Sequence, residues 1–308
     1  MFEIGKRVCA EEGGNTGFSS CVLNFRNIVG AILSPRPIVI TPEDAEDLKA
    51  FLKEKTLANN SRERAYPIPG FEEITDNTEE PIIETVGYGG KNKVRDGDYD
   101  WSFRYVRGGM CLSNGLRRWN NTYPYVMFID ADGVLFGTKQ GDNLVSVPLT
   151  LYDAPPWRPN TGSESTIYAV QFSFRPHFIN EDKEFIDTGS IGFFSDIVGL
   201  QNVNLKVLDP ENAPVTKVKA FAGCDKSDLF DDFEDELEST ELWTAINASG
   251  EELDIVTVVA DPVTKSWTIT VDDAGETYFI NLAGPTELDA AGVSGYEGRR
   301  VMVEVTPT

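Results

Sequence analysis

Few residues in this chain have the type and spacing that enzyme chemistry needs. The single histidine, His177, follows Pro176, and no acid or nucleophile is arranged around it in the sequence. The chain has no G-x-S-x-G nucleophile elbow, no G-x-x-x-x-G-K-[ST] phosphate loop and no H-E-x-x-H zinc motif. We therefore predict a protein that is not an enzyme, with no catalytic residues, no cofactor and no bound metal.

The motif closest to an active site is Asp130-Ala-Asp-Gly133, at the end of the apolar segment 126–129. It resembles the first motif of haloacid-dehalogenase-type phosphohydrolases, a resemblance that would make Asp130 the nucleophile and Asp132 the acid/base, both on magnesium. That family continues into a helix-rich, doubly wound domain, whereas strand patterns follow here at once. We favour a β-hairpin in which Asp132 and Gly133 form a two-residue turn between strands at 123–129 and 134–138.

Two acidic segments have the composition of calcium ligands. The stretch 96–100 begins with the spacing of an EF-hand loop, but Trp101 replaces the required Gly and Arg107 replaces the required Glu. We predict a solvated hairpin tip there. Segment 225–238 interleaves acids with apolar residues at helical spacing, which indicates an amphipathic helix or an ordered acidic loop rather than a calcium site.

The cysteines Cys9, Cys21, Cys111 and Cys224 stand far apart, without a C-x-x-C pair and with only one histidine to complete a zinc site. We predict four ordinary thiols. No run of about eighteen apolar residues is present to span a bilayer, and the first residues lack the apolar core of a signal peptide. The sequence therefore predicts no membrane contact and synthesis in a cytosol.

Charge sets a further limit on function. Asp and Glu number 50 against 27 Lys and Arg, for a net charge of -23. Affinity for nucleic acid comes mainly from neutralising phosphates with Lys and Arg, so this chain is expected to repel DNA. Solubility alone explains such an excess. Repulsion also suits a channel through which DNA slides without sticking.

The pattern along the chain predicts a mainly β protein of two domains, at 1–210 and 211–308. Thr41 as N-cap, Pro42 at the first helical position and Asp44 as acidic partner predict a helix to about Lys55. A short helix is expected near 112–119, and 87–98 is expected to be a long, flexible, polar loop. Strands are expected at 28–33, 66–74, 82–88, 99–106, 123–129, 134–138, 144–151, 166–174 and 203–208.

A polar seam with two prolines at 208–214 is expected to separate the second domain, which carries most of the excess negative charge. The second domain is expected to be an appended immunoglobulin-like β-sandwich, and its size fits that fold. Its strands are expected at 215–222, 253–259, 266–271, 277–282 and 300–305.

Segment 64–140 carries a resemblance to a known family. It brings together Y-P-I-P-G-F-E-E-I-T-D-N-T-E-E at 66–80, T-V-G-Y-G-G-K at 85–91, W-S-F-R-Y at 101–105 and the 128–133 hairpin. Over about residues 1–210 the chain resembles virion structural proteins of tailed phages infecting Bacteroidota, and among them most of all tail tube subunits.

This resemblance implies a tail-tube-like β-sandwich or barrel with a flanking α-helix. It implies assembly in the bacterial host cytoplasm into stacked, usually hexameric rings of the virion tail, in contact with other phage tail proteins. Strands from every subunit would line the lumen, and genomic DNA would pass through it during ejection without specific binding. The C-terminal domain would be an addition that the minimal family pattern does not require.

Within this interpretation, clustered acids between strands are the candidate lumen lining: Glu72, Glu73, Glu79, Glu80 and Glu84. Alternation places Glu72 and Glu73 on opposite faces, so at most one of that pair lines the bore. An outer solvated hairpin is the alternative. The candidate contacts between rings lie in the glycine-bearing loop, which could become ordered on a neighbour: Gly87, Gly89, Gly90, Lys91, Lys93 and Arg95.

Other functions stay open at this point. A capsid decoration protein or a neck ring protein has the same general character. An adhesive or carbohydrate-binding β-module could line a sugar groove with Trp101, Trp119, Trp157 and Tyr152. A phosphohydrolase would depend on Asp130 and Asp132.

Overall fold

The computed structural model describes residues 3–5, 27–105, 109–159, 168–188, 197–209, 215–224, 226–272 and 277–304. The fold is mainly β, as the sequence predicts, and the chain forms two compact units. Unit 1 comprises Met1–Thr56 and Asn60–Val198, and unit 2 comprises Leu57–Asn59 and Gly199–Thr308. The division therefore falls before the proline-bearing seam, because the strands on either side of that seam pair with each other.

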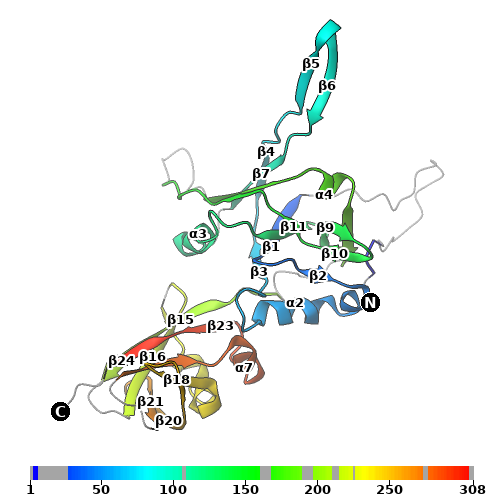
Figure 1. Cartoon of the computed structure of the whole chain (residues 1–308). Helices are drawn as coiled ribbons and strands as arrows, with labels where there is room; N and C mark the ends of the chain where they lie inside the picture. The colour runs from blue at the N-terminus through cyan, green and yellow to red at the C-terminus, as the bar shows by residue number, and fades with distance from the viewer. Residues whose placement is uncertain are drawn as a thin grey trace. The chain divides into compact units, whose positions relative to one another are not determined.

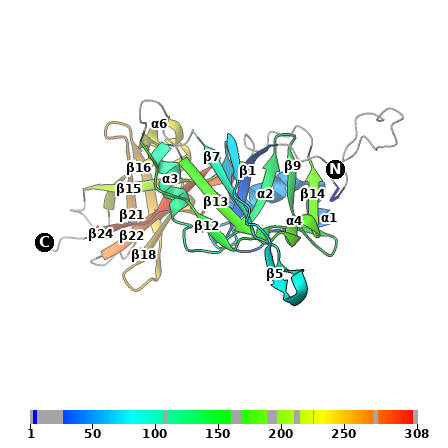
Figure 2. The same cartoon turned by 90° about the horizontal axis from the view of Figure 1, so that it is seen from above.

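Unit 1 is a β-sandwich flanked by helices, as Figures 1 and 2 show. Its described residues form an eight-stranded sheet, here called sheet I, and a four-stranded sheet, here called sheet II. The strands of sheet I are, in spatial order, β2 (Val39–Ile40), β10 (Asn143–Val145), β9 (Val134–Gln140), β8 (Tyr125–Asp130), β1 (Ile28–Ser34) and β3 (Tyr66–Pro69), with β11 (Val147–Pro148) beside β8 and β14 (Lys183–Asp187) beside β9. The strands of sheet II are β12 (Leu151–Asp153), β13 (Tyr168–Phe174), β7 (Tyr99–Tyr105) and β4 (Glu73–Asp76).

Sheet I is covered on both faces, which explains why β8 is an unbroken apolar run. Val126 and Phe128 face sheet II and join a core rich in aromatic rings, including Phe103 and Phe172. The alternate residues of β8 face the helices and pack in a second core with Ile32, Leu48 and Leu52. The predicted alternation of β13 is confirmed, since its even-numbered residues from 168 to 174 point into the first core.

The predicted N-terminal helix forms with its predicted cap. Thr41 accepts a hydrogen bond from the Asp44 backbone N–H, while the Asp44 carboxylate accepts from the Thr41 N–H, so the capping box is complete. The helix divides at Asp47 into α1 (Pro42–Glu46) and α2 (Leu48–Leu57). Two further helices of unit 1 are α3 (Gly109–Arg117), close to the prediction at 112–119, and α4 (His177–Asn180).

Unit 2 is a second sandwich, with its own core around Trp243, Trp267 and Tyr278. One sheet contains β20 (Ile255–Asp261), β21 (Ser266–Val271), β16 (Val215–Ala222), β15 (Gln201–Asp209) and β23 (Tyr296–Arg299), with β17 (Ser227–Asp228) beside β16. The other contains β19 (Glu252–Leu253), β18 (Trp243–Asn247), β22 (Thr277–Leu282) and β24 (Val301–Glu304). Its helical segments are α6 (Phe230–Phe233), α7 (Pro285–Ala290) and the 3-10 turns η2 (Glu236–Glu238) and η3 (Thr240–Leu242).

Candidate functional site

A β-hairpin projects from unit 1 beyond sheet II (Figure 1). It consists of β5 (Ile82–Val86), the short turn η1 (Gly87–Gly89) and β6 (Gly90–Arg95), which pair antiparallel as a two-stranded sheet of their own. The expectation of a flexible loop at 87–98 is therefore wrong. The partner strand escaped the sequence pattern because Lys and Asn are depleted in strands.

The base of the hairpin explains one glycine. Gly97 lies where the returning strand crosses the outgoing chain, and a Cβ at this position would collide with the carbonyl group of Glu79. The Glu79 N–H also donates to the carbonyl oxygen of Asp98, at 3.2 Å. The stretch 96–100 is thus the junction between hairpin and sandwich, and the expectation that it is a hairpin tip is wrong.

The true tip carries a strained aromatic residue. Tyr88 has φ 64°, in the left-handed region, and Gly89 follows at φ 80°. This conformation costs a non-glycine residue about 1 kcal/mol or more. The Tyr88 side chain is also fully exposed, so no contact within the chain offsets that cost.

Large apolar side chains are exposed along the whole hairpin. Every residue of β5 and β6 is exposed. Isolated two-stranded hairpins are marginally stable in water, and contiguous exposed apolar surface commonly marks an interaction site. The exposed apolar set is Ile82, Ile83, Val86, Tyr88 and Val94, with Ile74 of β4 at the base.

All five candidate lumen acids are exposed, but they do not share one position. Glu72 precedes β4, and Glu73 lies on β4, where Arg104 Nη1 is 3.3 Å from its Oε2. Glu79 and Glu80 lie at the base of the hairpin, with Arg95 Nη2 3.9 Å from Glu79 Oε2. Glu84 lies on β5. Among the described residues, Glu72, Glu80 and Glu84 form no ion pair, so their charges are the uncompensated ones.

The candidate inter-ring residues fall on the tip and on β6. Gly87 and Gly89 belong to the turn, and Gly90 begins β6. Lys91, Lys93 and Arg95 alternate along β6, and Lys93 pairs with Asp96 three residues on. The sequence pattern identified these polar residues but not the exposed apolar residues between them. The local feature that could have indicated a binding residue was Tyr88, an aromatic residue inside a glycine-rich turn.

The Asp130 motif is a turn, as predicted, although the turn has three residues rather than two. β8 ends at Asp130 and β9 begins at Val134, with Gly133 at φ 82° before it. This is the common three-residue hairpin with a left-handed glycine. Asp130 is buried, and its carboxylate accepts hydrogen bonds within the turn.

The side chains of the two acidic segments considered as calcium ligands have structural roles. Asp100 accepts two hydrogen bonds from Gln171 Nε2, at 2.8 and 2.7 Å across sheet II. The acidic segment after Cys224 is ordered, as expected, with Leu229, Phe230 and Leu237 buried under short helical turns. No group of three or more His, Cys, Asp or Glu side chains within the described ranges is placed to hold a metal ion.

The aromatic residues proposed for a sugar groove do not come together in a groove. Trp101 packs on Phe103, Phe128 and Phe174, and Trp119 packs edge-on against Tyr66 at 4.9 Å. Burial raises the pKa of Tyr152, whose hydroxyl donates to the Leu116 carbonyl oxygen at 3.1 Å. Burial likewise raises the pKa of Tyr105 to about 12. Trp157 is the exposed member of the set.

His177 begins α4, and its ring lies 4.0 Å from the Phe178 ring, centroid to centroid. It lines a pocket of about 350 Å³ at the hairpin base, with Arg95 and Arg175 among its neighbours. Acidic side chains line the same pocket, so no charge of one sign dominates it.

The prediction of four ordinary thiols is wrong for two cysteines. Cys111 of α3 and Cys224, which follows β16, are disulfide-bonded. Spacing along the chain argues against a C-x-x-C metal site, but it says nothing about which cysteines meet in space. Cys9 and Cys21 lie outside the described residues.

Comparison of the chain with protein-family models and with curated proteins gives no match. No helix in the described part of the chain combines the length and the apolar character needed to cross a membrane. The hairpin and the surfaces of unit 1 are therefore the basis for assigning a function.

Proposed function

We propose that this protein is a structural subunit of a phage tail tube, which self-assembles into stacked hexameric rings around an acidic channel that conducts DNA. The observation that carries the proposal is the β5–β6 hairpin. It extends away from a closed sandwich and exposes apolar side chains over its whole length. Such an element gains stability when it is buried on a neighbour.

The resemblance of 64–140 to tail tube subunits supports the same assignment, because the hairpin lies inside that segment. The hairpin then makes the contact between successive rings. Tyr88 is its anchor, since tyrosine is enriched among the residues that dominate binding energy at protein interfaces. No catalytic role is part of the proposal, and the buried Asp130 already serves the β8–β9 turn.

The channel wall is assigned to the acidic stretch before and within the hairpin. Its uncompensated acids are Glu72, Glu80 and Glu84, all exposed. Six copies of even two of these place about a dozen negative charges around one ring, and a narrow wall focuses their field on passing DNA. The expected place of action is the virion tail, after assembly in the host cytoplasm.

Negative-stain microscopy of the purified protein tests the proposal, because tubes or rings of uniform width are expected. The decisive variant replaces residues 83–94 by Asn-Gly, a two-residue hairpin turn that keeps β4 and β7 connected. Its circular dichroism should match the wild type, since the removed residues contact no core. Tube growth should stop. Wild-type protein without rings or tubes, or normal tubes from the shortened variant, would contradict the proposal.

A further inference from the structure

The β6 strand is a basic surface on a strongly acidic protein. Three of its six residues are cations, whereas the chain as a whole carries a net charge of -23. The pairing register and strand alternation place Lys91 and Lys93 on the same hairpin face as Ile83 and Thr85. Among the described residues, none forms an ion pair with Lys91, whereas Lys93 pairs with Asp96 and Arg95 with Glu79. This face therefore offers apolar and positively charged groups side by side.

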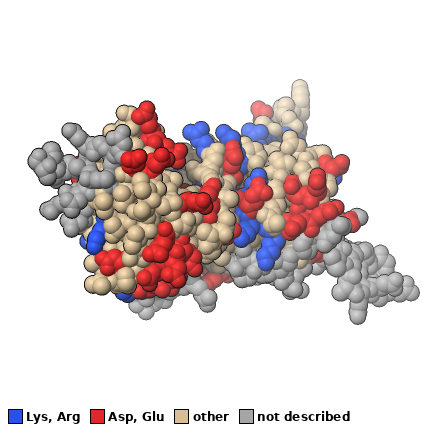
Figure 3. Space-filling model, turned by 90° about the horizontal axis from the view of Figure 1, so that it is seen from below, with Lys and Arg blue, Asp and Glu red and all other residues tan. Residues whose placement is uncertain are grey.

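The α1 side of unit 1 has the complementary charge. Glu43, Glu46 and Asp47 are exposed along α1 and at its end. In the view from below, acidic side chains gather over the end of unit 1 that carries α1 (Figure 3). The exposed apolar residues Pro42 and Val39 lie beside them.

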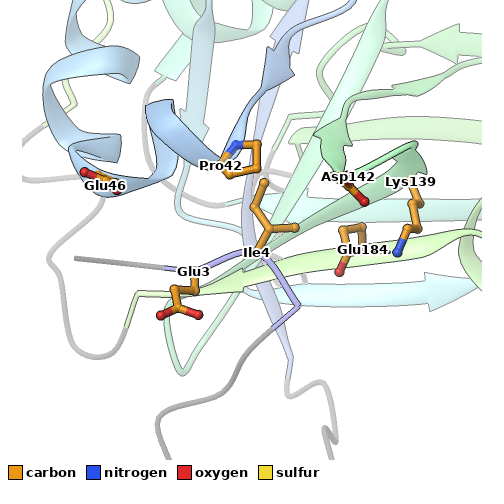
Figure 4. Close-up of a pocket in the computed structure, with 7 residues that line it drawn as sticks. All are labelled: Glu3, Ile4, Pro42, Glu46, Lys139, Asp142 and Glu184. Atoms are coloured by element: carbon orange, nitrogen blue, oxygen red, sulfur yellow. Dashed lines mark ion pairs between the residues drawn. The ribbon is translucent and has the colours of Figure 1, made fainter.

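A pocket of about 360 Å³ opens on this side (Figure 4). The described residues that line it carry four carboxylates, from Glu3, Glu46, Asp142 and Glu184, and one ammonium, from Lys139. Lys139 Nζ lies 3.3 Å from Glu184 Oε2, and the Glu184 side chain is buried. Glu46 and Asp142, which form no ion pair with any described residue, give this side of the pocket a negative charge that suits an incoming Lys or Arg side chain.

The two surfaces lie at opposite sides of the same unit. Figure 1 shows the hairpin rising beyond sheet II, while α1 and α2 cover the far face of sheet I. A copy cannot satisfy its own hairpin in this arrangement, but a second copy can. Contact between two different surfaces of identical subunits gives a closed ring where the rotation between copies closes and an open stack where it does not. Because the two surfaces lie on opposite sides of the unit, this contact favours a stack.

We infer that the β6 strand of one copy docks on the acidic α1 side of a second copy, where the pocket at Glu46 and Asp142 receives a lysine side chain. This inference rests on the proposed function, because it names the surface that receives the hairpin. The contact joins charged and apolar groups, so rising salt should weaken it without changing the fold.

A charge-swap experiment tests the pairing. In the hairpin variant, Lys91→Glu and Lys93→Glu, the hairpin is negative. In the pocket variant, Glu46→Lys and Asp142→Lys, the receiving surface is positive. All four side chains are exposed, so thermal unfolding of both variants should match the wild type.

Sedimentation velocity of each variant alone should show loss of the large species, since like charges then face each other. The equimolar mixture should regain it, because each hairpin finds a pocket of opposite charge. The matched control Lys206→Glu with Lys219→Glu, on β15 and β16, should sediment like the wild type.

The outcomes of this experiment separate the proposed pairing from the proposed function. Variants that assemble alone like the wild type, or a mixture that stays dissociated, overturn the pairing. If that happens while the shortened hairpin still blocks tubes, the proposed function survives and only the receiving surface is wrong. A wild type that is monomeric at every salt and protein concentration overturns both.

Discussion

The Asp130 carboxylate accepts a hydrogen bond of 2.9 Å from the backbone N–H of Asp132, across the turn that joins β8 to β9. The same oxygen accepts a second bond of 2.9 Å from Val134 N–H, and Asp130 is only 1% exposed. The D-x-D pattern therefore has a folding role in this chain, since the first aspartate organises the turn that carries the second.

The turn predicts different stabilities for two substitutions of Asp130. Asp130→Asn retains an oxygen acceptor for both N–H groups, so stability and assembly should stay close to wild type. Asp130→Ala leaves both donors without that acceptor and should cost about 1.5–3 kcal/mol. Urea unfolding measures the difference, with Asp132→Asn, at the half-buried second aspartate, as the control. Magnesium-dependent hydrolysis of a phosphate ester that disappears in Asp130→Asn would overturn this assignment.

The elements predicted well are those whose signals are local. The Thr41 capping box, the alternation of β13 and the glycine turn after Asp130 each depend on neighbouring residues, and each is present. The short strands β14 and β18 were not predicted. β14 pairs with β9 only after a long stretch of chain, and such a pairing leaves no local mark. The proline seam was misleading because it joins two strands of one sheet.

A substitution at the hairpin tip tests whether Tyr88 binds a neighbouring subunit or only shapes the turn. Tyr88→Gly removes the ring and relieves the left-handed conformation, which glycine adopts at no steric cost. The melting temperature should be unchanged or slightly higher, while assembly measured by sedimentation should fall. Tyr123→Gly is the matched control, since Tyr123 is another exposed tyrosine. Wild-type assembly by Tyr88→Gly would show that the residue only shapes the turn.

The candidate site was only half visible in the sequence, for a physical reason. The composition of 87–98, rich in charged residues and glycine, was enough to predict that this segment lies on the surface. Whether Ile83 or Val94 is buried or exposed depends on whether a third strand lies beside β5 and β6. Among the described residues these two strands form a sheet of their own, and no local pattern records that. The acidic pocket likewise joins residues from the chain start, α1 and the β9–β10 turn.

The disulfide-bonded cysteines predict a specific alkylation pattern. Without reductant, iodoacetamide should leave Cys111 and Cys224 unlabelled in the oxidised protein, because a disulfide sulfur is no nucleophile. After reduction and unfolding both should be labelled, which peptide mass mapping detects. Labelling of both residues before reduction, in protein purified under air, would contradict the bonded state.

An ion pair on the surface of unit 2 predicts that one carboxyl group, Asp261, titrates at an unusually low pH. Lys217 Nζ donates to Asp261 Oδ2 at 2.9 Å, and this bond, with help from Thr264, lowers the pKa of Asp261 to about 2. The depressed pKa stabilises the fold above the ordinary value of 3.8, and the contribution is lost as pH falls through about 2.

Lys217→Met should raise the Asp261 pKa toward 3.8, which carboxyl NMR titration measures. Lys219→Met is the control, because Lys219 forms no ion pair with any described residue. If the Asp261 pKa is the same in the wild type and in Lys217→Met, the ion pair is not the cause of the lowered pKa.

The last prediction concerns where unit 2 begins. β15 lies between β16 and β23 in its sheet, with antiparallel pairing to the first and parallel pairing to the second. A fragment of residues 199–308 keeps β15 and should give a cooperative thermal transition with a β-type circular dichroism spectrum. A fragment of 213–308 lacks it, so β16 and β23 lose their shared partner and Val203 and Leu205 leave the core. That loss of buried apolar surface should make the shorter fragment unfold at a much lower temperature or aggregate. Equal melting temperatures for the two fragments would place the boundary at the proline seam instead.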